Sequence, residues 1–335
     1  MTILAAVQAS SVWLELDATI DKACTLITEA GEAGASFIAF PENFVPGHPS
    51  WFHYIPTGHR DSITKAVRLI NQSVIIPSSH TDRLSEATKA AGIIAVVGVT
   101  ERGQASSGTL YNTQLLLGPD GVVIGKHQKL VATMTERMVH APGAPETQRT
   151  FDTSLGVVSA LICGENSNPL ALGMIAAQHP VIHAASWPAH VSPSSRGGVR
   201  DISHIASRGV AHMLGCFVVS ASGVNSPEMV ADIAVTDEDR AFLHDPGKNG
   251  GACIVSPSGE VLAGPLEGNI EGIVYADVDL NACIRSRLVI DMGGHYNRSD
   301  IYQLRVDNRP RPLVSVVTEP LDDGTADHSG EEIEK

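Results

Sequence analysis

The sequence predicts an α/β fold, because apolar runs of strand length alternate with helix-permitting stretches along most of its 335 residues. Hydrophobic residues make up 43% of the chain and aromatic residues only 4%, so a large core must be built from Ala, Val, Ile and Leu. Neither a repeat nor a linker interrupts the pattern, which favours a single domain. The strand-like runs cover residues 3–8, 36–40, 93–99, 112–117, 157–162, 181–185, 217–221, 253–255 and 272–277.

Local signals place several of these elements. Apolar residues recur at helical spacing from Thr19 to Gly31, which predicts an amphipathic helix after the first strand. The second run stops at Pro41, which cannot continue a strand ladder. A Gly-Pro-Asp-Gly turn at Gly118–Gly121 starts a short strand that leads to Lys129.

Two later segments are polar. Residues Pro227–Asn249 predict a long loop at a pocket or an interface. Residues 305–335 form a C-terminal extension beyond the domain of residues 1–304. Its last part, Glu319–Lys335, is rich in Asp, Glu, Gly and Ser and predicts a disordered acidic tail.

Composition excludes some partners. The formal net charge of −14 disfavours nucleic acid and anionic membranes, since both require basic patches. No apolar run approaches the length of a membrane span. The first basic residue is Lys22, so we expect no signal peptide. The five widely spaced cysteines indicate reduced thiols, and hence a cytoplasmic protein.

Three strand-like runs end in chemically reactive side chains, namely Glu42, Lys129 and Cys163. Taken singly, these residues are most simply a solvated carboxylate, a surface lysine and a packed thiol. The carboxyl ends of parallel strands gather functional groups, however, so we expect the three to meet. A helix beginning after Cys163 would lower the pKa of the thiol and favour the nucleophilic thiolate.

Four motifs resemble those of the nitrilase superfamily, which are carbon–nitrogen hydrolases with a Glu–Lys–Cys catalytic set. The motifs are Phe40–Trp51, Gly125–Leu130, Ala160–Asn166 and Gly293–Asp300. The last resembles the Gly-His-Tyr-x-Arg-x-Asp signature of the true nitrilase branch. The likeness runs from about Ile3 to about Leu304 and implies the four-layer α-β-β-α sandwich of that superfamily.

The resemblance also implies roles. Cys163 would be the nucleophile, Glu42 the general base, and Lys129 the cation that stabilises the tetrahedral species. Glu136 lies where the family carries a second glutamate, which would orient Lys129 or water; a purely structural salt bridge with Arg137 or another neighbour is the alternative. Neither a cofactor nor a metal is implied.

The residues expected to bind substrate are Trp51, Gly164, Ser186 and Trp187. Nitrilases usually carry Trp directly after the cysteine, so Gly164 removes a wall and leaves room for bulkier substrates. The stretch Val139–Ala144 likewise replaces a Trp-Gly-x-Gly-Asp-Gly segment. The Gly164 N–H remains available as an oxyanion donor.

The sequence therefore predicts a nitrilase that converts an organic nitrile to a carboxylic acid and ammonia through a Cys thioimidate and thioester. An amidase or carbamoyl-amide hydrolase with the same triad is the enzymatic alternative. A non-catalytic subunit that keeps the fold is the alternative from another class. Family habit predicts a homo-oligomer, a dimer or a larger, even spiral, assembly whose only other partner is a small nitrile or amide.

Overall fold

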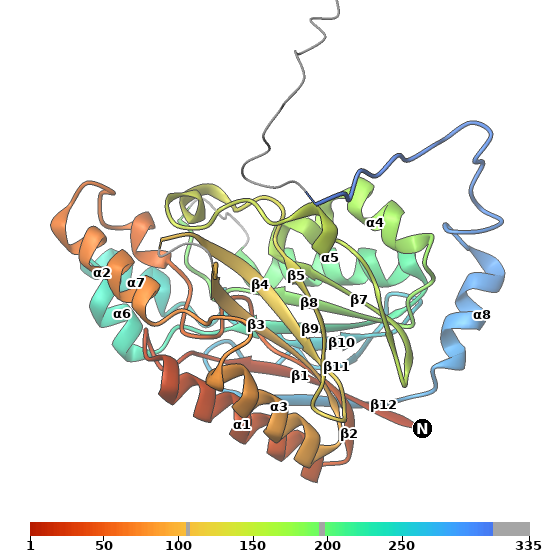
Figure 1. Ribbon diagram of the computed structural model, residues 1–335, viewed down its shortest axis with the longest axis horizontal. Helices are drawn as coiled ribbons and strands as arrows, with labels where there is room; N and C mark the ends of the chain where they lie inside the picture. Colours follow the sequence, from red (N-terminus) through yellow and green to blue (C-terminus); the bar gives the residue numbers. More distant parts are fainter. Residues whose placement is uncertain (105–107, 194–197, 311–335) are drawn as a thin grey trace, which may run out of the picture.

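The computed structural model describes residues 1–104, 108–193 and 198–310. Within these ranges twelve strands form one hydrogen-bonded sheet in the order β5-β4-β3-β2-β1-β9-β8-β7-β6, with β12 added to β1 and β10–β11 added to β9 (Figure 1). The strands are β1 (Thr2–Ala9), β2 (Ala35–Ala39), β3 (Ile94–Arg102), β4 (Leu110–Leu117), β5 (Val123–Gln128), β6 (Phe151–Thr153), β7 (Gly156–Ile162), β8 (Ile182–Trp187), β9 (Phe217–Gly223), β10 (Cys253–Val255), β11 (Val261–Ala263) and β12 (Gly272–Val278).

The sheet divides into two halves at β1. Strand β2 pairs with the first part of β1 in parallel, whereas β9 pairs only with its last two residues, Gln8 and Ala9. Strands β1, β2 and β3 are parallel in one half, and β7, β8 and β9 are parallel in the other. This short joint lets one half fold over the other.

Alternating side chains place one half of the sheet on top of the other. In β1, Leu4 and Ala6 join an apolar cluster that also contains Val158 of β7 and Phe217 of β9. Ala5 belongs to a second cluster, on the outer side of the first half. Because successive residues of a strand point to opposite faces, the first cluster is the layer between two packed half-sheets.

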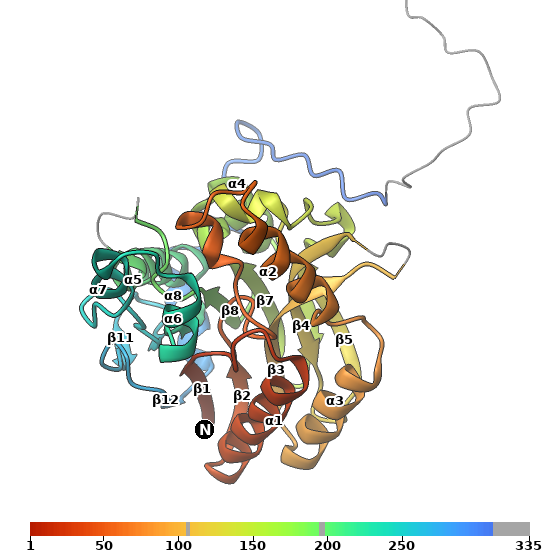
Figure 2. The same cartoon turned by 90° about the vertical axis from the view of Figure 1, so that its left-hand side faces the viewer.

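Helices cover both outer faces. The helices are α1 (Leu16–Glu32), α2 (Arg60–Asn71), α3 (Ser79–Ala91), α4 (Pro169–Ala176), α5 (Gly198–Leu214), α6 (Pro227–Ile233), α7 (Asp237–Leu243) and α8 (Asn281–Val289). Helices α1 and α3 lie side by side beneath the first half, with α4 and α5 on the opposite side (Figures 1 and 2). Ile20, Ala23 and Ile27 of α1 are buried, as the helical spacing predicts. The four-layer α-β-β-α sandwich is thus confirmed.

The long loop predicted for Pro227–Asn249 is wrong. This segment contains α6 and α7, whose polar residues lie on the outside while Val230, Ile233 and Leu243 are buried. The Ser226 Oγ accepts a hydrogen bond from Met229 N at 3.1 Å and so caps α6. Two short capped helices can therefore form in a segment whose overall composition is typical of a loop.

The described C-terminal part contains no helix or strand after α8. It runs from α8 back past α4, where the Leu304 side chain lies close to Gly173 (Figure 1). Tyr296 and Tyr302 are exposed. The predicted acidic tail, Glu319–Lys335, lies outside the described residues.

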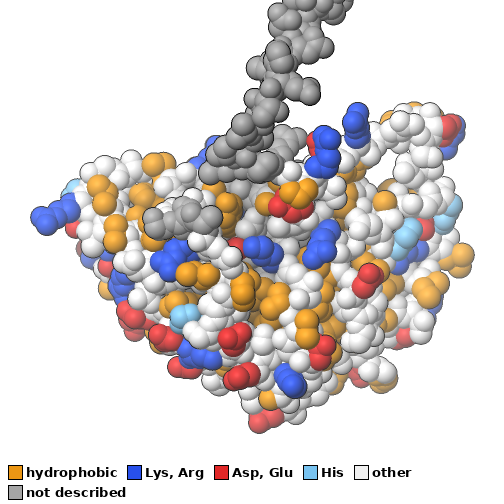
Figure 3. Space-filling model, viewed as in Figure 1, with side chains coloured by type: hydrophobic (Ala, Val, Ile, Leu, Met, Phe, Trp, Pro, Cys, Tyr) orange, Lys and Arg blue, Asp and Glu red, His pale blue; other side chains and the backbone are white. Residues whose placement is uncertain are grey.

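The surface carries charges of both signs. On the face shown in Figure 3, Lys and Arg side chains are interspersed with Asp and Glu. Among the described helices, none combines the length and the apolar character that crossing a membrane requires.

Candidate active site

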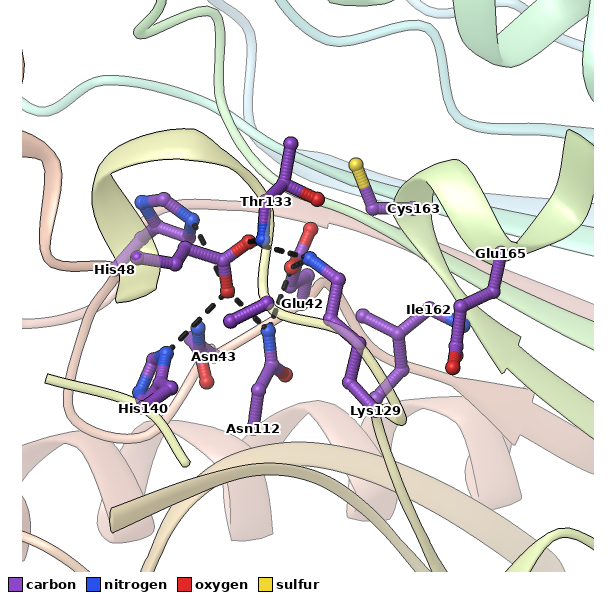
Figure 4. A network of polar contacts seen from close by, with 12 residues as sticks. Glu42, Asn43, His48, Asn112, Lys129, Thr133, His140, Ile162, Cys163 and Glu165 are labelled. Carbon is purple, nitrogen blue, oxygen red and sulfur yellow. Dashed lines mark hydrogen bonds and ion pairs between the residues drawn. The ribbon is translucent and has the colours of Figure 1, made fainter. Parts of the chain in front are cut away.

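The three predicted catalytic side chains follow strand ends at one edge of the sandwich. Glu42 follows β2 and Lys129 follows β5 in one half, whereas Cys163 follows β7 in the other. The Glu42 N–H donates to the Trp187 carbonyl at 3.2 Å, which ties the halves together beside the site. Figure 4 shows Lys129 pointing from its loop toward Glu42, with Cys163 close by on a separate element. The structure therefore brings together the three residues that the sequence singled out.

Lys129 is buried between two carboxylates. Its Nζ lies 2.7 Å from Glu42 Oε1 and 2.5 Å from Glu136 Oε2. The Asn112 Nδ2 donates to both glutamates, at 2.6 Å to Glu42 and 2.8 Å to Glu136. Since Arg137 donates to the Ala132 carbonyl instead, the alternative salt bridge between Glu136 and Arg137 does not form.

The two carboxylates differ in their affinity for a proton. Burial raises the pKa of Glu42 to about 7, although Lys129 opposes the shift, and the charge of Glu136 adds to it. Burial acts in the same direction on Glu136, but Lys129 and His140 outweigh it and hold the pKa of Glu136 well below its usual value. Burial would lower the pKa of Lys129, yet the two carboxylates raise it well above the usual value. Glu136 is thus the permanent counter-ion of Lys129, and Glu42 is able to exchange a proton near neutral pH.

One carboxylate oxygen of Glu42 is available as a hydrogen-bond acceptor. Its Oε1 accepts from Lys129 and Asn112, while its buried Oε2 has no hydrogen-bond partner among the described residues. A general base needs a free acceptor toward the proton it removes. This oxygen is therefore suited to accept a proton from a thiol or a water molecule.

Cys163 stands on a strained turn. Its φ of 51° lies in the left-handed region, which costs a non-glycine residue on the order of 1–3 kcal/mol. The turn is the short 3-10 helix η4 (Cys163–Ser167). The Asn166 Nδ2 holds it by donating to the Cys163 carbonyl at 3.0 Å and to the Leu161 carbonyl at 3.3 Å. Asn166 is itself oriented by His183, whose Nε2 lies 2.8 Å from its Oδ1.

The prediction that a helix N-terminus lowers the pKa of the Cys163 thiol is wrong. Burial raises that pKa, and the charge of Glu42 raises it further. Lys129 and the Gly164 N–H oppose the shift without overcoming it. The Cys163 side chain therefore favours the thiol form, which needs a base to become reactive.

The predicted substrate-binding residues fall into two groups. Gly164 is exposed, and a Cβ atom added there would meet no atom within 4 Å. Trp51, Ser186 and Trp187 are buried. The Ser186 Oγ donates to the Phe40 carbonyl at 2.8 Å and accepts from Gln114 Nε2 at 2.8 Å, so it joins the two half-sheets. Contact of any of these four residues with the substrate stays a prediction.

Sequence reasoning did not assign a role to three polar residues that surround Glu136. Asn112 bridges the glutamates as described above, and His140 Nδ1 lies 3.3 Å from Glu136 Oε1. His48 Nε2 lies 4.0 Å from the same oxygen, and burial lowers the pKa of His48 to about 3, which keeps it neutral. Asn112 begins a strand-like run, His48 lies within the Phe40–Trp51 motif and His140 within the Val139–Ala144 stretch, but no pattern indicated that any of them contacts Glu136.

One group of side chains has the composition of a metal site. Glu42, His48 and Glu136 offer ligand atoms that lie within 4.8 Å of one another. The ammonium group of Lys129 already binds both carboxylates and supplies the positive charge there. The donor set therefore fits a lysine better than a metal ion.

Comparison with known proteins identifies the family of this chain. The family model described as carbon-nitrogen hydrolase matches residues 3–287. A nitrilase of Pseudomonas syringae pv. syringae is 37% identical, covering 93% of this chain and 91% of the relative. An aliphatic nitrilase of Rhodococcus rhodochrous is 35% identical, and the match covers 91% of this chain and 82% of the relative.

Solved structures show the same fold. The Nit3 protein of Saccharomyces cerevisiae, a member of branch 10 of the nitrilase superfamily, superposes with a TM-score of 0.65 at 22% identity, covering 86% of this chain and 94% of Nit3. An amidase from Nesterenkonia sp. AN1 gives a TM-score of 0.61 at 18% identity, covering 85% and 92%. The chain belongs to the carbon–nitrogen hydrolases of the nitrilase superfamily and is a hydrolase acting on carbon–nitrogen bonds.

Proposed function

We propose that this enzyme hydrolyses an organic nitrile to a carboxylic acid and ammonia, with Cys163 as the nucleophile. The observation that carries the proposal is the buried Glu42–Lys129–Glu136 group beside the Cys163 turn. Relatives named nitrilase, at 35–37% identity over more than nine-tenths of the chain, support a nitrile as the substrate.

The reaction begins with transfer of the thiol proton of Cys163 to Glu42 as sulfur attacks the nitrile carbon. The nitrile nitrogen takes up a proton, and a thioimidate results. A first water molecule then adds to the same carbon, ammonia leaves, and a thioester remains on the sulfur. A second water molecule, deprotonated by Glu42, releases the carboxylic acid and restores the thiol. Two water molecules are consumed for each nitrile.

Lys129 stabilises the negative charge that develops at each tetrahedral stage. Because two carboxylates raise its pKa, it stays an ammonium and does not act as a base. The Gly164 N–H, which faces the sulfur, is a second donor to that charge. Glu136 keeps the lysine charge balanced while Glu42 gains and loses protons.

An amidase or carbamoyl-amide hydrolase is the second candidate. It would use the same triad and pass only through the thioester. The open space at Gly164 favours it, since a planar amide group is wider than a linear nitrile.

A homo-oligomer fits the exposed apolar side chains of two helices. Ile205 of α5 and Leu288 of α8 are 76% and 81% exposed. The oligomeric state is tested by light scattering after size-exclusion chromatography, which measures the molar mass in solution; we expect that of a dimer or a larger species.

A cytoplasmic location fits the cysteines. All five are free thiols, as expected in the reducing cytoplasm.

The test of the function is ammonia release from matched nitriles and primary amides, with Cys163→Ala as the blank. Acid and ammonia from nitriles, with the amides inert, support a nitrilase. Turnover of the amides alone supports the second candidate. Equal ammonia release by Cys163→Ala would refute the role of the thiol.

A further inference from the structure

We propose that Glu165 and His127 form a positioning pair that holds the Lys129 loop against the Cys163 turn. This inference rests on the proposed function. Neither side chain belongs to the group that performs the chemistry. His127 lies two residues before Lys129, and Glu165 lies two residues after Cys163.

One carboxylate binds both catalytic segments. Glu165 Oε1 accepts the N–H of Leu130 at 2.8 Å, and Leu130 directly follows Lys129. Glu165 Oε2 accepts the N–H of Ile162 at 3.1 Å, and Ile162 directly precedes Cys163. A single side chain thus joins the backbone directly after Lys129 to the backbone directly before Cys163.

His127 completes the pair from the strand that carries the lysine. Its Nε2 lies 2.8 Å from Glu165 Oε2, and its side chain is 1% exposed. His127 and Lys129 are two residues apart, so both point into the space between the half-sheets, whereas Lys126 and Gln128 point outward to Glu101. The alternation of β5 therefore delivers the lysine and its support to the same side.

The bond to Ile162 by itself would be an ordinary cap of the η4 turn. The bonds to Leu130 and His127 reach the other half of the sandwich, and a cap does not require them. Strands β5 and β7 belong to different halves, and no ladder joins them among the described strands. Glu165 supplies a polar connection where the sheet supplies none.

The carboxylate is suited to this task because it stays ionised. Burial would raise the pKa of Glu165, but His127 and the two backbone N–H groups outweigh burial and lower it. Bonds to an ionised acceptor are roughly twice as strong as neutral ones. Loss of the charge should therefore loosen the spacing between Lys129 and Cys163.

The test compares Glu165→Gln with Glu271→Gln as a matched control. The Glu271 carboxylate also accepts a backbone N–H, from Ser10 at 2.9 Å, and pairs with Lys22 at 2.7 Å, so its partners do not include Lys129 or the residues beside Cys163. Because a misplacement of about 1 Å can cost about 100-fold in rate, we expect Glu165→Gln to lower kcat by about 10- to 100-fold. We expect KM to change less than about threefold, since uniform binding is untouched. Glu271→Gln should keep the wild-type kcat.

Two substitutions of His127 test the pair from the other side. Gln can present an N–H donor near the position of Nε2, so His127→Gln should keep kcat within about fivefold, whereas His127→Leu should match Glu165→Gln. A wild-type kcat in Glu165→Gln would overturn the proposal. If that variant does not fold, equal kcat values for His127→Gln and His127→Leu would overturn it.

Alkylation of Cys163 by iodoacetamide separates this inference from the proposed function. If the wild-type protein turned over neither nitriles nor amides, the function would fail. The positioning pair would still predict alkylation about tenfold slower in Glu165→Gln and His127→Leu than in the wild type, because the thiol loses its ordered base. Unchanged alkylation rates would overturn the pair.

Discussion

Replacing Glu136 by Gln should change the acidity of a different residue, Glu42. The pKa of Glu42 is raised from 4.5 to about 7, a difference of about 2.5 units, or about 3 kcal/mol. Burial is the largest cause, and the charge of Glu136 is one that can be removed. With Glu136 neutral, Lys129 keeps Glu42 as its single buried counter-ion, which favours the ionised form of Glu42. We expect the pKa of Glu42 to fall by about 1–2 units.

The assay is the pH dependence of kcat/KM between about pH 4 and pH 9, which reports ionisations of the free enzyme. The base must be ionised to accept the thiol proton, so wild-type activity rises with pH through about 7. In Glu136→Gln this acid limb should move down by about 1–2 units, and the plateau should fall about tenfold because the base is weaker.

The control is Glu101→Gln, which removes a buried carboxylate that pairs with Lys126 instead of Lys129. Its acid limb should stay at the wild-type position. An unchanged or raised acid limb in Glu136→Gln would refute the assignment of Glu136 as counter-ion and Glu42 as base.

Three further predictions concern single side chains. Glu42→Gln should gain stability relative to the wild type by about 3 kcal/mol between pH 4.5 and pH 8, measured by urea unfolding at each pH. The sign follows from the raised pKa, since the contribution of Glu42 to stability is complete below the unfolded value and is lost as pH rises through about 7; a pH-independent difference would contradict it. Gly164→Trp fills open space, so it should shift kcat/KM toward smaller nitriles, and an equal loss for all sizes would argue against a substrate wall there. Lys129→Met should destabilise the fold by about 3–5 kcal/mol at pH 8, because it leaves two buried carboxylates without a cation; thermal unfolding measures this, and an unchanged melting temperature would exclude the paired charges.

The positions of Glu42, Lys129 and Cys163 could be predicted because they depend on local rules. Each follows an apolar run, and strand ends on one side of a layered α/β fold share an edge. The helix from Leu16 to Glu32 and most strands follow from periodicity in the same way. The four layers needed the family resemblance, since periodicity does not say which strands pack face to face.

The remaining features depend on contacts between segments far apart in the chain. The pKa of the Cys163 thiol is raised by burial and by Glu42, which lies 121 positions earlier in the chain, so a local helix argument gave the wrong sign. Asn112 reaches Glu136, 24 positions later, only after β4 and η2 (Met134–Met138) come together. His140 lies only four positions beyond Glu136, but no sequence pattern singled it out. Likewise, the hydrogen bond from the Leu130 N–H to Glu165 connects the two half-sheets.

The most direct test of the central claim is the mass of the peptide that contains Cys163, after an acid quench during turnover of a saturating nitrile. The account predicts an added mass equal to the thioimidate or to the thioester of that nitrile, located on Cys163 and absent once substrate is exhausted. Steady ammonia release with no adduct on Cys163, and with undiminished turnover by Cys163→Ala, would contradict it.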